Sequence, residues 1–304
     1  MKCRNKLGLI GWLLLALPLA AQNNTVVLKR AFVERYKDRA TIDVSFFVDH
    51  AHKRPNPPAN DGDMHVAGRA QKEVGLPMVA EVMNAAQPGE VAAVTEIHAV
   101  EGNNSQLPVT GVWRFWFEHP AKQQIQFADV PVPGNTNPDH SFEIHPITKF
   151  DKNDVTGAFQ PVAGFQPYAA ATAFGGYEKL KITVSATSSA VSISASKAAY
   201  NYAEFQMTLA GSPKKLADGG YAVLANVNGK ADESIATNVR MIFVPGTPPL
   251  LQLLNQKLGD GDTMHVVGIP RINLNAISAF IKASGGQRLT RKLPYEMIIV
   301  AVVK

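Results

Sequence analysis

Two segments of this sequence place carboxylates and a histidine at close spacing. They are DGDMHVAG, residues 61–68, and DGDTMHVVG, residues 260–268. Carboxylate and imidazole groups together are ligands for zinc and similar divalent ions. The same groups also perform the acid-base chemistry of hydrolysis. The two segments are therefore the first candidates for a functional site.

The first segment has potential partners elsewhere in the N-terminal half. Residues two apart in an extended chain share a face, so Asp61, Asp63 and His65 are expected to point the same way. Glu143 and His145, in the sequence EIHP, share a face of their own strand. Seven of the eight histidines also lie in this half. The predicted polar or metal-binding cluster comprises Asp61, Asp63, His65, His119, Glu143 and His145.

Each motif also has a structural interpretation. Asp-Gly-Asp commonly forms a turn, and a histidine after it can bond the turn backbone. Glu143 and His145 can equally belong to a polar cluster that ties strands together, since buried polar groups must be hydrogen-bonded whether or not they are catalytic. No local spacing matches a strong motif such as H-E-x-x-H. A cofactor is therefore not expected, and a bound divalent metal is the alternative.

The second segment differs from the first by one inserted residue, Thr263. Asp262 and His265 are three apart, which places them on opposite faces of a regular strand unless a bulge absorbs the extra residue. A turn that leads into a strand tolerates such an insertion better than a coordination geometry does. We therefore expect Asp260, Asp262 and His265 to be structural, and any chemistry to reside in the first copy.

The N-terminus is typical of a cleaved secretory signal. Lys2, Arg4 and Lys6 precede the apolar run LGLIGWLLLALPLA, and small residues end it before Gln22. The run is short for a membrane span. We expect residues 1–21 to be removed and the mature protein to be secreted or periplasmic, with no membrane span.

Cleavage would change the composition of the protein. The single cysteine would leave with the signal, which excludes disulfides and thiolate chemistry. The mature chain would carry 27 basic and 25 acidic residues. This near-neutral charge disfavours general binding to nucleic acid or to anionic membranes.

The pattern of residues 22–150 predicts an antiparallel unit of five or six strands. Apolar and polar residues alternate in ATIDVSFFVDH, residues 40–50, and in VTGVWRFWFEHP, residues 109–120. The strand SFEIHPITKF contains Pro146, which predicts an edge or a bulge. Arg114 and Trp116 share one strand face, which is either a ligand-stacking face or a solvated or interdomain face.

Beyond residue 150 the pattern predicts a second β-rich unit. Residues 151–176 lose the alternation and are expected to form a linker or surface crossing. Residues 177–304 resume as a meander of strands. Two helices are expected near the end, at TPPLLQLLNQKLG with Gly259 as C-cap and at NLNAISAFIKASGG, followed by a buried strand at YEMIIVAVV.

The order DGDMHV, MVAEVMNA, VTGVWRFWFEH and FEIHP resembles an exported bacterial domain of unknown function with an OB-like barrel. The resemblance covers roughly residues 24–150. It implies that the first unit is an OB-like antiparallel barrel within a mainly β protein, and it implies no reaction. By position it singles out Asp61, Asp63, His65, Glu81, His119, Glu143 and His145.

Three functions fit these observations. The first is a non-catalytic binding or scaffold protein of the cell envelope, with an OB-like groove for a saccharide, a peptide or a protein. The second is a metal-dependent hydrolase, acting on substrates such as phosphodiesters, that uses the Asp/His/Glu cluster. The third is single-stranded nucleic-acid binding through Trp113, Trp116 and Arg114, which the charge disfavours. We favour the first.

Overall fold

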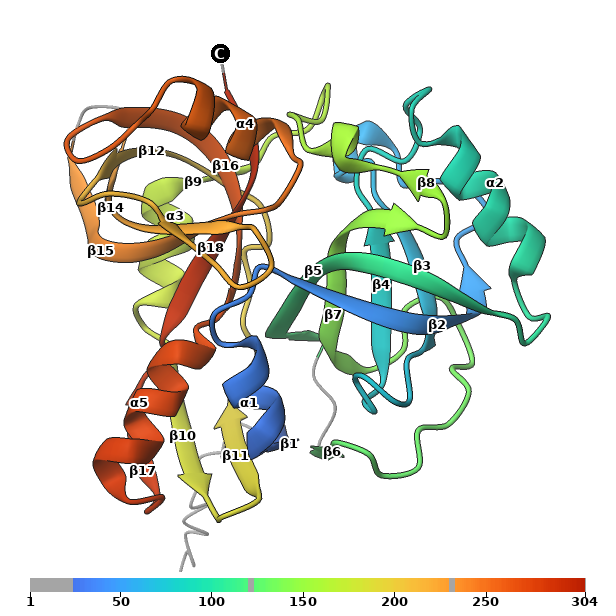
Figure 1. Cartoon of the computed structure of the whole chain (residues 1–304), viewed down its shortest axis with the longest axis horizontal. Coiled ribbons are helices and arrows are strands. Elements are labelled where there is room, and N and C mark those ends of the chain that lie inside the picture. Colours follow the sequence, from blue (N-terminus) through green and yellow to red (C-terminus); the bar gives the residue numbers. More distant parts are fainter. Residues whose placement is uncertain (1–23, 120–122, 230–232, 304) are drawn as a thin grey trace, which may run out of the picture.

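The computed structural model describes residues 24–119, 123–229 and 233–303. The expected signal peptide lies outside these residues. Strands account for 44% of the protein and helices for 18%, which confirms the prediction of a mainly β, barrel-containing fold. Figure 1 shows two barrels side by side and a third sheet below them.

The first barrel closes through five strands. A meander of three antiparallel strands comes first, and the fourth and fifth strands form an antiparallel pair. Parallel pairing of the third strand with the fifth, and antiparallel pairing of the first with the fourth, complete the OB-like barrel. A helix, α2 (Val91–Val100), connects the third strand to the fourth. The strands are β2 (Thr41–Ala51), β3 (Met64–Arg69), β4 (Met78–Val82), β5 (Gln106–His119) and β7 (His140–Phe150).

The second barrel repeats this topology, which the sequence pattern predicted only as a meander. Its third and fifth strands again pair in parallel, and all its other neighbouring strands pair antiparallel. A helix, α4 (Pro248–Asn255), again connects the third strand to the fourth. The strands are β12 (Ala203–Leu209), β14 (Tyr221–Asn228), β15 (Ser234–Phe243), β16 (Thr263–Ile272) and β18 (Tyr295–Val302).

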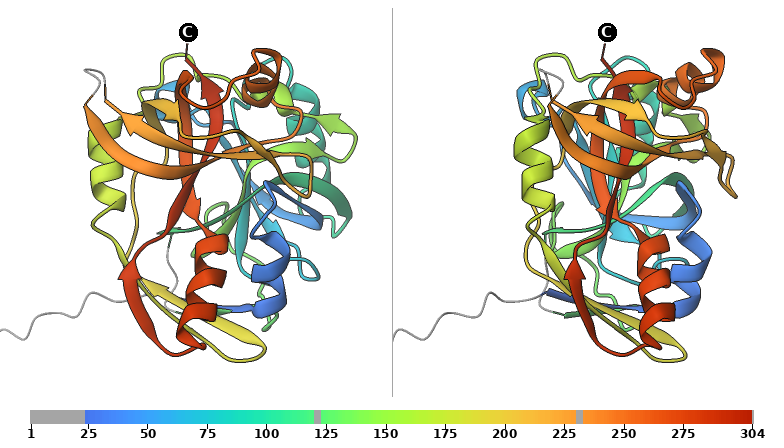
Figure 2. Two further views of the ribbon diagram at one scale, coloured as in Figure 1. Left: turned by 60° about the vertical axis from the view of Figure 1, so that its left-hand side comes forward. Right: turned by 90° about the vertical axis from the view of Figure 1, so that its left-hand side faces the viewer.

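The third sheet takes strands from both halves of the chain. The N-terminal strand pairs with β11 and β6, and β10 joins β11 to β17. Two helices, α1 (Arg30–Tyr36) and α5 (Leu274–Ser284), pack together beside it (Figure 2). The strands are β1 (Asn24–Lys29), β6 (Gln123–Ile125), β10 (Lys181–Ala186), β11 (Ala190–Ala195) and β17 (Leu289–Lys292).

The segment between the barrels carries short elements. A strand, β8 (Asn153–Asp154), pairs with β7 of the first barrel. A second strand, β9 (Tyr168–Ala169), pairs with β12 of the second barrel and leads into α3 (Ala170–Tyr177). The chain therefore contacts both barrels as it passes from one to the other.

The bulge expected at Pro146 is present, and β7 is not an edge strand. Gly111 pairs with Ile147 while Trp113 pairs with Ile144, so one residue of β5 opposes two residues of β7. A Cβ on Gly111 would lie 2.8 Å from the Pro146 carbonyl oxygen and 2.8 Å from the Ile147 Cα. Glycine is therefore required where the bulge presses against β5.

Both C-terminal helices form as predicted. The side chain of Asn273 accepts the N–H of Ala276 at the start of α5, and Gly285 ends that helix in the left-handed conformation. α4 begins at Pro248 but ends before Gly259, since its C-cap is Gln256. The predicted cap at Gly259 was wrong.

The two barrels meet along their fourth strands, β5 and β16. Nε of Arg114 donates to the Pro270 carbonyl at 3.0 Å, and Nη1 of Arg271 donates to the Trp113 carbonyl at 3.0 Å. Each arginine also pairs with a glutamate on the fifth strand of its own barrel. The corresponding segments read VTGVWRF and VVGIPRI. The Asp-Gly-Asp segments, in contrast, precede non-corresponding strands, β3 and β16.

Candidate functional site

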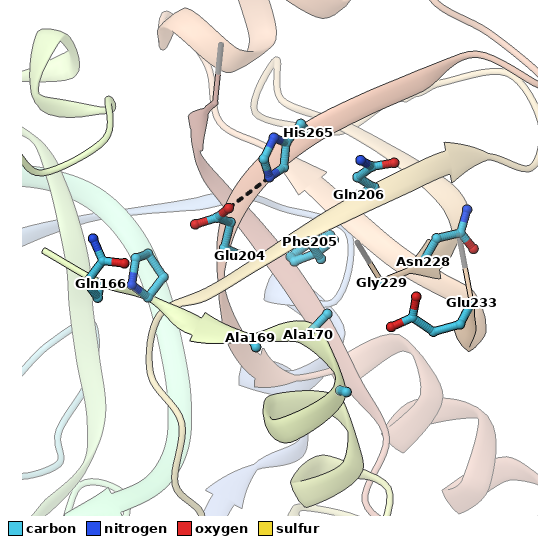
Figure 3. Close-up of a pocket in the computed structure, with 12 residues that line it drawn as sticks. Gln166, Ala169, Ala170, Glu204, Phe205, Gln206, Asn228, Gly229, Glu233 and His265 are labelled. Atoms are coloured by element: carbon cyan, nitrogen blue, oxygen red, sulfur yellow. Dashed lines mark hydrogen bonds and ion pairs between the residues drawn. The ribbon is translucent and has the colours of Figure 1, made fainter. Parts of the chain in front are cut away.

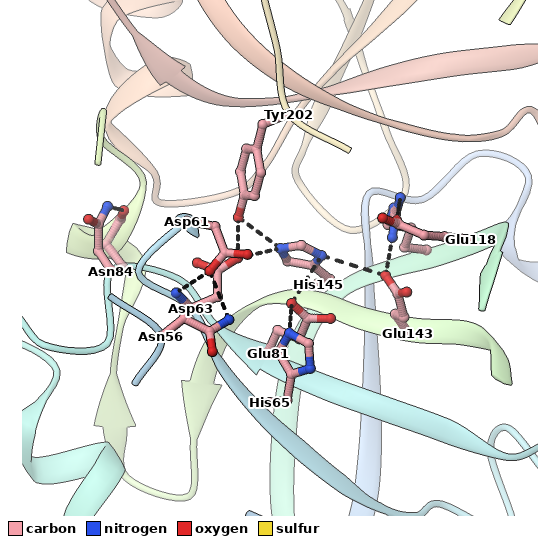
Figure 4. Close-up of polar contacts among 12 residues, drawn as sticks. Asn56, Asp61, Asp63, His65, Glu81, Asn84, Glu118, Glu143, His145 and Tyr202 are labelled. Atoms are coloured by element: carbon pink, nitrogen blue, oxygen red, sulfur yellow. Dashed lines mark hydrogen bonds and ion pairs between the residues drawn. The ribbon is translucent and has the colours of Figure 1, made fainter. Parts of the chain in front are cut away.

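Three residues of the predicted cluster, Asp63, Glu143 and His145, lie in one buried group where the first barrel meets Tyr202 of the second (Figure 4). Glu143 and His145 lie on the face of β7 opposite Phe142 and Ile144, which belong to the apolar core. Every residue of this group is at most 5% exposed. We call this group the buried polar cluster, and it comprises Asp63, Glu81, Arg114, Glu143, His145 and Tyr202.

The Asp-Gly-Asp turn directs Asp63 into the cluster. Oδ1 of Asp61 accepts the N–H of Asp63 and the side-chain amide of Asn56, both at 3.0 Å. This is the turn chemistry expected of an aspartate. Oδ2 of Asp63 accepts the hydroxyl of Tyr202 at 2.5 Å, and its Oδ1 is buried without a hydrogen-bond partner in the described part of the chain.

His145 is surrounded by carboxylates. Its Nε2 lies 2.9 Å from the Tyr202 hydroxyl and 3.3 Å from Asp63 Oδ2. Its Nδ1 lies 3.6 Å from Glu81 and 3.5 Å from Glu143. Burial alone would lower the pKa of His145, but Glu81, Asp63 and Glu143 together raise that pKa well above its usual value. These carboxyl groups therefore favour the protonated form of the ring.

Arg114 balances the remaining negative charge. It forms ion pairs with Glu143, and with Glu118 at 2.9 Å. Burial opposes ionisation of Glu143, yet the Arg114 guanidinium holds the pKa of that carboxyl well below its usual range. Burial raises the pKa of Glu81 against the opposing effect of His145. Asp63, Glu81 and Glu143 thus share the positive groups Arg114 and His145.

The remaining N-terminal candidates lie at the margins of the cluster. His65 reaches Glu81 at 3.5 Å, and its ring stacks on His52 at 4.6 Å. His119, at the end of β5, stacks on His140 at 4.9 Å. Nε2 of His140 lies 3.2 Å from Oε1 of Glu143, so this histidine pair borders the cluster.

Arg114 and Trp116 form no exposed ligand face. Arg114 is 0% exposed and Trp116 is 1% exposed, because the second barrel and α3 cover β5. The Trp116 ring packs edge-on against Tyr177. Trp113 is also buried, beneath the Arg271 guanidinium. These aromatic rings are therefore not available to stack on the bases of a nucleic acid.

The second Asp-Gly-Asp segment lies apart from the cluster. Oδ2 of Asp262 accepts the N–H of Gly259 at 2.8 Å, which closes a turn, and Asp260 is exposed in the same turn. His265 pairs with Glu204 at 3.0 Å. This pair borders a groove of about 570 Å³ on the second barrel (Figure 3), whose other polar side chains include Gln166, Gln206 and Asn228.

Among the described residues, two groups of side chains have the composition and spacing to hold a metal ion. The ligand atoms of Asp63, Glu81 and His145 lie within 4.8 Å of one another. Those of a second group do so as well, namely His119, His140 and Glu143. Nitrogen and carboxylate oxygen from three residues is a donor set typical of zinc.

Sequence reasoning missed Tyr202 and Arg271. Tyr202 lies 139 residues from Asp63 in the chain, and no local motif surrounds it. Arg271 lies six residues after His265, and nothing in its local sequence marks it as part of a site. The likeness of VTGVWRF to VVGIPRI relates Arg271 to Arg114. It becomes apparent once both strands are known to be the fourth strands of their barrels.

No family model matches this chain, and no curated protein is significantly similar to it. Among the described residues, no helix is long and apolar enough to cross a membrane.

Proposed function

We propose that this protein is an exported, non-catalytic binding or scaffold protein of the cell envelope, in which the buried polar cluster joins two OB-like barrels. One observation carries the proposal: Tyr202, from the second barrel, contacts Asp63 and His145 of the first. The buried polar cluster, which combines carboxylates with a histidine, therefore connects the two barrels.

Burial argues against hydrolysis at this cluster. A general acid or base must come within hydrogen-bond distance of its substrate. Asp63 and His145 are 0% exposed and Glu143 is 3% exposed. Tyr202 lines the neighbouring cavity of about 460 Å³, and its hydroxyl contacts both His145 and Asp63.

The groove on the second barrel is the better site for a ligand. It is open, and its walls carry amide side chains together with the Glu204–His265 pair. Amides and paired polar groups in a concave site fix the orientation of polar ligands. A saccharide or an extended peptide, both rich in hydrogen-bonding groups, fits this chemistry.

Calorimetric titration with oligosaccharide and peptide fragments of envelope polymers tests the groove. We expect one of these probe classes to bind, and Gln206→Ala or His265→Ala to weaken binding at least about fivefold by removal of one or two hydrogen bonds. Gln256→Ala, an exposed glutamine outside the groove, is the matched control. If neither class binds, or if all three variants bind equally well, the groove is not the ligand site.

Export rests on the N-terminal pattern of basic residues followed by an apolar run and small residues. We expect the exported protein to begin at Gln22. Mass spectrometry of the protein from intact cells measures this directly. Retention of Met1 on the mature protein in a membrane fraction would reject export by a cleaved signal.

A metal ion within the cluster is the second candidate, and the unpartnered Oδ1 of Asp63 favours it. A divalent ion held by Asp63, Glu81 and His145 would supply positive charge in place of the His145 proton and would be the starting point for the hydrolase alternative. Protein purified without added metal then contains about one zinc equivalent, and zinc raises the melting temperature of the native protein but not of His145→Ala. Equal zinc responses of the two proteins would exclude the cluster as the binding site.

A further inference from the structure

We propose that His119, His140 and Glu143 bind a divalent cation of the zinc class at the edge of the cavity between the two barrels. This site is separate from the candidate at Asp63, Glu81 and His145, and it does not depend on the binding function proposed above. Its three ligand atoms lie within 4.8 Å of one another.

The hydrogen bonds of His140 identify the nitrogen that is available to a metal. Nδ1 of His140 lies 2.6 Å from the Pro138 carbonyl oxygen. A carbonyl only accepts hydrogen bonds, so Nδ1 carries a proton and donates. A neutral His140 therefore presents a lone pair on Nε2. Orientation of a ligand histidine by a backbone carbonyl on its other nitrogen is the usual arrangement in metal sites.

The pairing of His140 with Glu143 requires a positive charge between them. Nε2 of His140 lies 3.2 Å from Oε1 of Glu143. Two lone pairs at this distance repel each other unless a proton or a cation lies between them. Two metal–ligand bonds of ~2.1 Å at a tetrahedral angle separate their donor atoms by about 3.4 Å. The observed spacing is therefore suitable for a shared zinc ion.

Glu143 is oriented by its other oxygen. Its Oε2 pairs with Arg114 and lies 3.5 Å from Nδ1 of His145, so Oε1 remains directed at His140. Carboxylate ligands of metals are commonly held by such outer hydrogen bonds and ion pairs. The buried cluster would thus position one ligand of this second site.

His119 makes the site accessible. Unlike His140, it lines the cavity of about 460 Å³, together with Glu118, Asp61 and Tyr202. The described residues provide three ligands, which is the number found in zinc sites that keep a position for water or another oxygen ligand. That fourth position would face the cavity, so a ligand entering the cavity could reach the metal.

Titration with zinc chloride, and with cobalt(II) chloride as a spectroscopic probe, tests the site in the mature protein. We expect stoichiometric binding and a visible cobalt spectrum typical of four-coordinate N/O ligation. His119→Ala should weaken zinc binding at least about a hundredfold, since it removes a direct ligand, whereas loss of an outer partner costs about 10–100-fold. His119 is partly exposed, so this variant should fold, and circular dichroism checks that it does.

Two controls locate the ion. His98→Ala removes a histidine on α2, outside the site, and Glu81→Gln removes a ligand of the other candidate group. Both should keep the affinity of the native protein within about threefold. Loss of binding in Glu81→Gln with retention in His119→Ala would place the ion in the buried cluster and overturn the proposal. Absence of zinc binding at millimolar concentration would overturn it as well.

Discussion

At the scale of single residues, the buried polar cluster is explained by charge balance. Asp63, Glu81 and Glu143 enter an apolar interface, where an unpaired charge is very unfavourable. Arg114 pairs with Glu143, His145 lies beside Asp63 and Glu81, and burial raises the pKa of Glu81. Removal of one partner leaves the others unpaired, which makes the cluster sensitive to single substitutions.

Glu90 is a buried carboxyl without this compensation. It precedes α2, and one of its oxygens is buried without a hydrogen-bond partner among the described residues. Burial and the nearby charge of Asp154 raise the pKa of Glu90 from 4.5 to about 7. The folded protein therefore binds this proton more tightly than the unfolded chain does. Its contribution to the free energy of unfolding must fall as the pH rises from 4.5 to about 7.

We predict that Glu90→Gln changes the pH dependence of stability. The free energy of unfolding of the variant should exceed that of the native protein by ~1–2 kcal/mol at alkaline pH and match it in acid. Urea unfolding on both sides of neutrality measures the difference. Asp129→Asn, at an exposed carboxyl, is the control and should show no such change. A pH-independent difference for Glu90→Gln would contradict the account.

At the scale of elements, the first barrel depends on a close approach of β5 to β7. Gly111 lies against the backbone of Pro146 and Ile147 and against the buried Ile144 side chain, so an added methyl group would force these neighbours to move. We predict that Gly111→Ala lowers the free energy of unfolding by ~1–3 kcal/mol through overpacking. Gly134→Ala is the matched control, because a methyl group added there would have no neighbour within 4 Å among the described residues. Equal midpoints of chemical denaturation for the two variants would show that the approach is not tight.

Much of the first barrel could be predicted because its strands alternate clearly. The alternation of β2 and β5 and the bulge at Pro146 are local features. α1 and α2 could not be predicted, since neither has a side-chain N-cap, as α5 has, or a proline in its first turn, as α4 has. The topology of the second barrel depends on the parallel pairing of β15 with β18, and no local pattern records a pairing between distant segments.

Part of the candidate site could also be predicted from the sequence. Periodicity placed Asp63, Glu143 and His145 in one group, because all three belong to one barrel. Periodicity could not add Tyr202 to this group, because Tyr202 belongs to the other barrel. It also could not predict that Arg114 and Trp116 are buried, because the second barrel and α3 cover them. A contact between barrels depends on how they dock, and residue spacing within one strand carries no information on docking.

At the scale of the whole molecule, the third sheet connects the halves of the chain. β1 and β6 come from the N-terminal half, and β10, β11 and β17 come from the C-terminal half. We predict that limited proteolysis cuts first within residues 160–168, where most side chains are exposed. The two fragments should then elute together in gel filtration under native conditions, because β1 remains paired with β11. Separate elution of the fragments would show that the barrels are independent domains.

The most direct test of the account is a double-mutant cycle across the barrel interface, with Asp63→Ala and Tyr202→Phe. A hydrogen bond to a buried carboxylate predicts a coupling free energy of about 1.5–3 kcal/mol, measured by urea unfolding in the presence of a chelator. Tyr200→Phe, at a tyrosine that lines the same cavity, should be additive with Asp63→Ala. Additivity of Asp63→Ala with Tyr202→Phe within about 0.5 kcal/mol would contradict the claim that the buried polar cluster joins the two barrels.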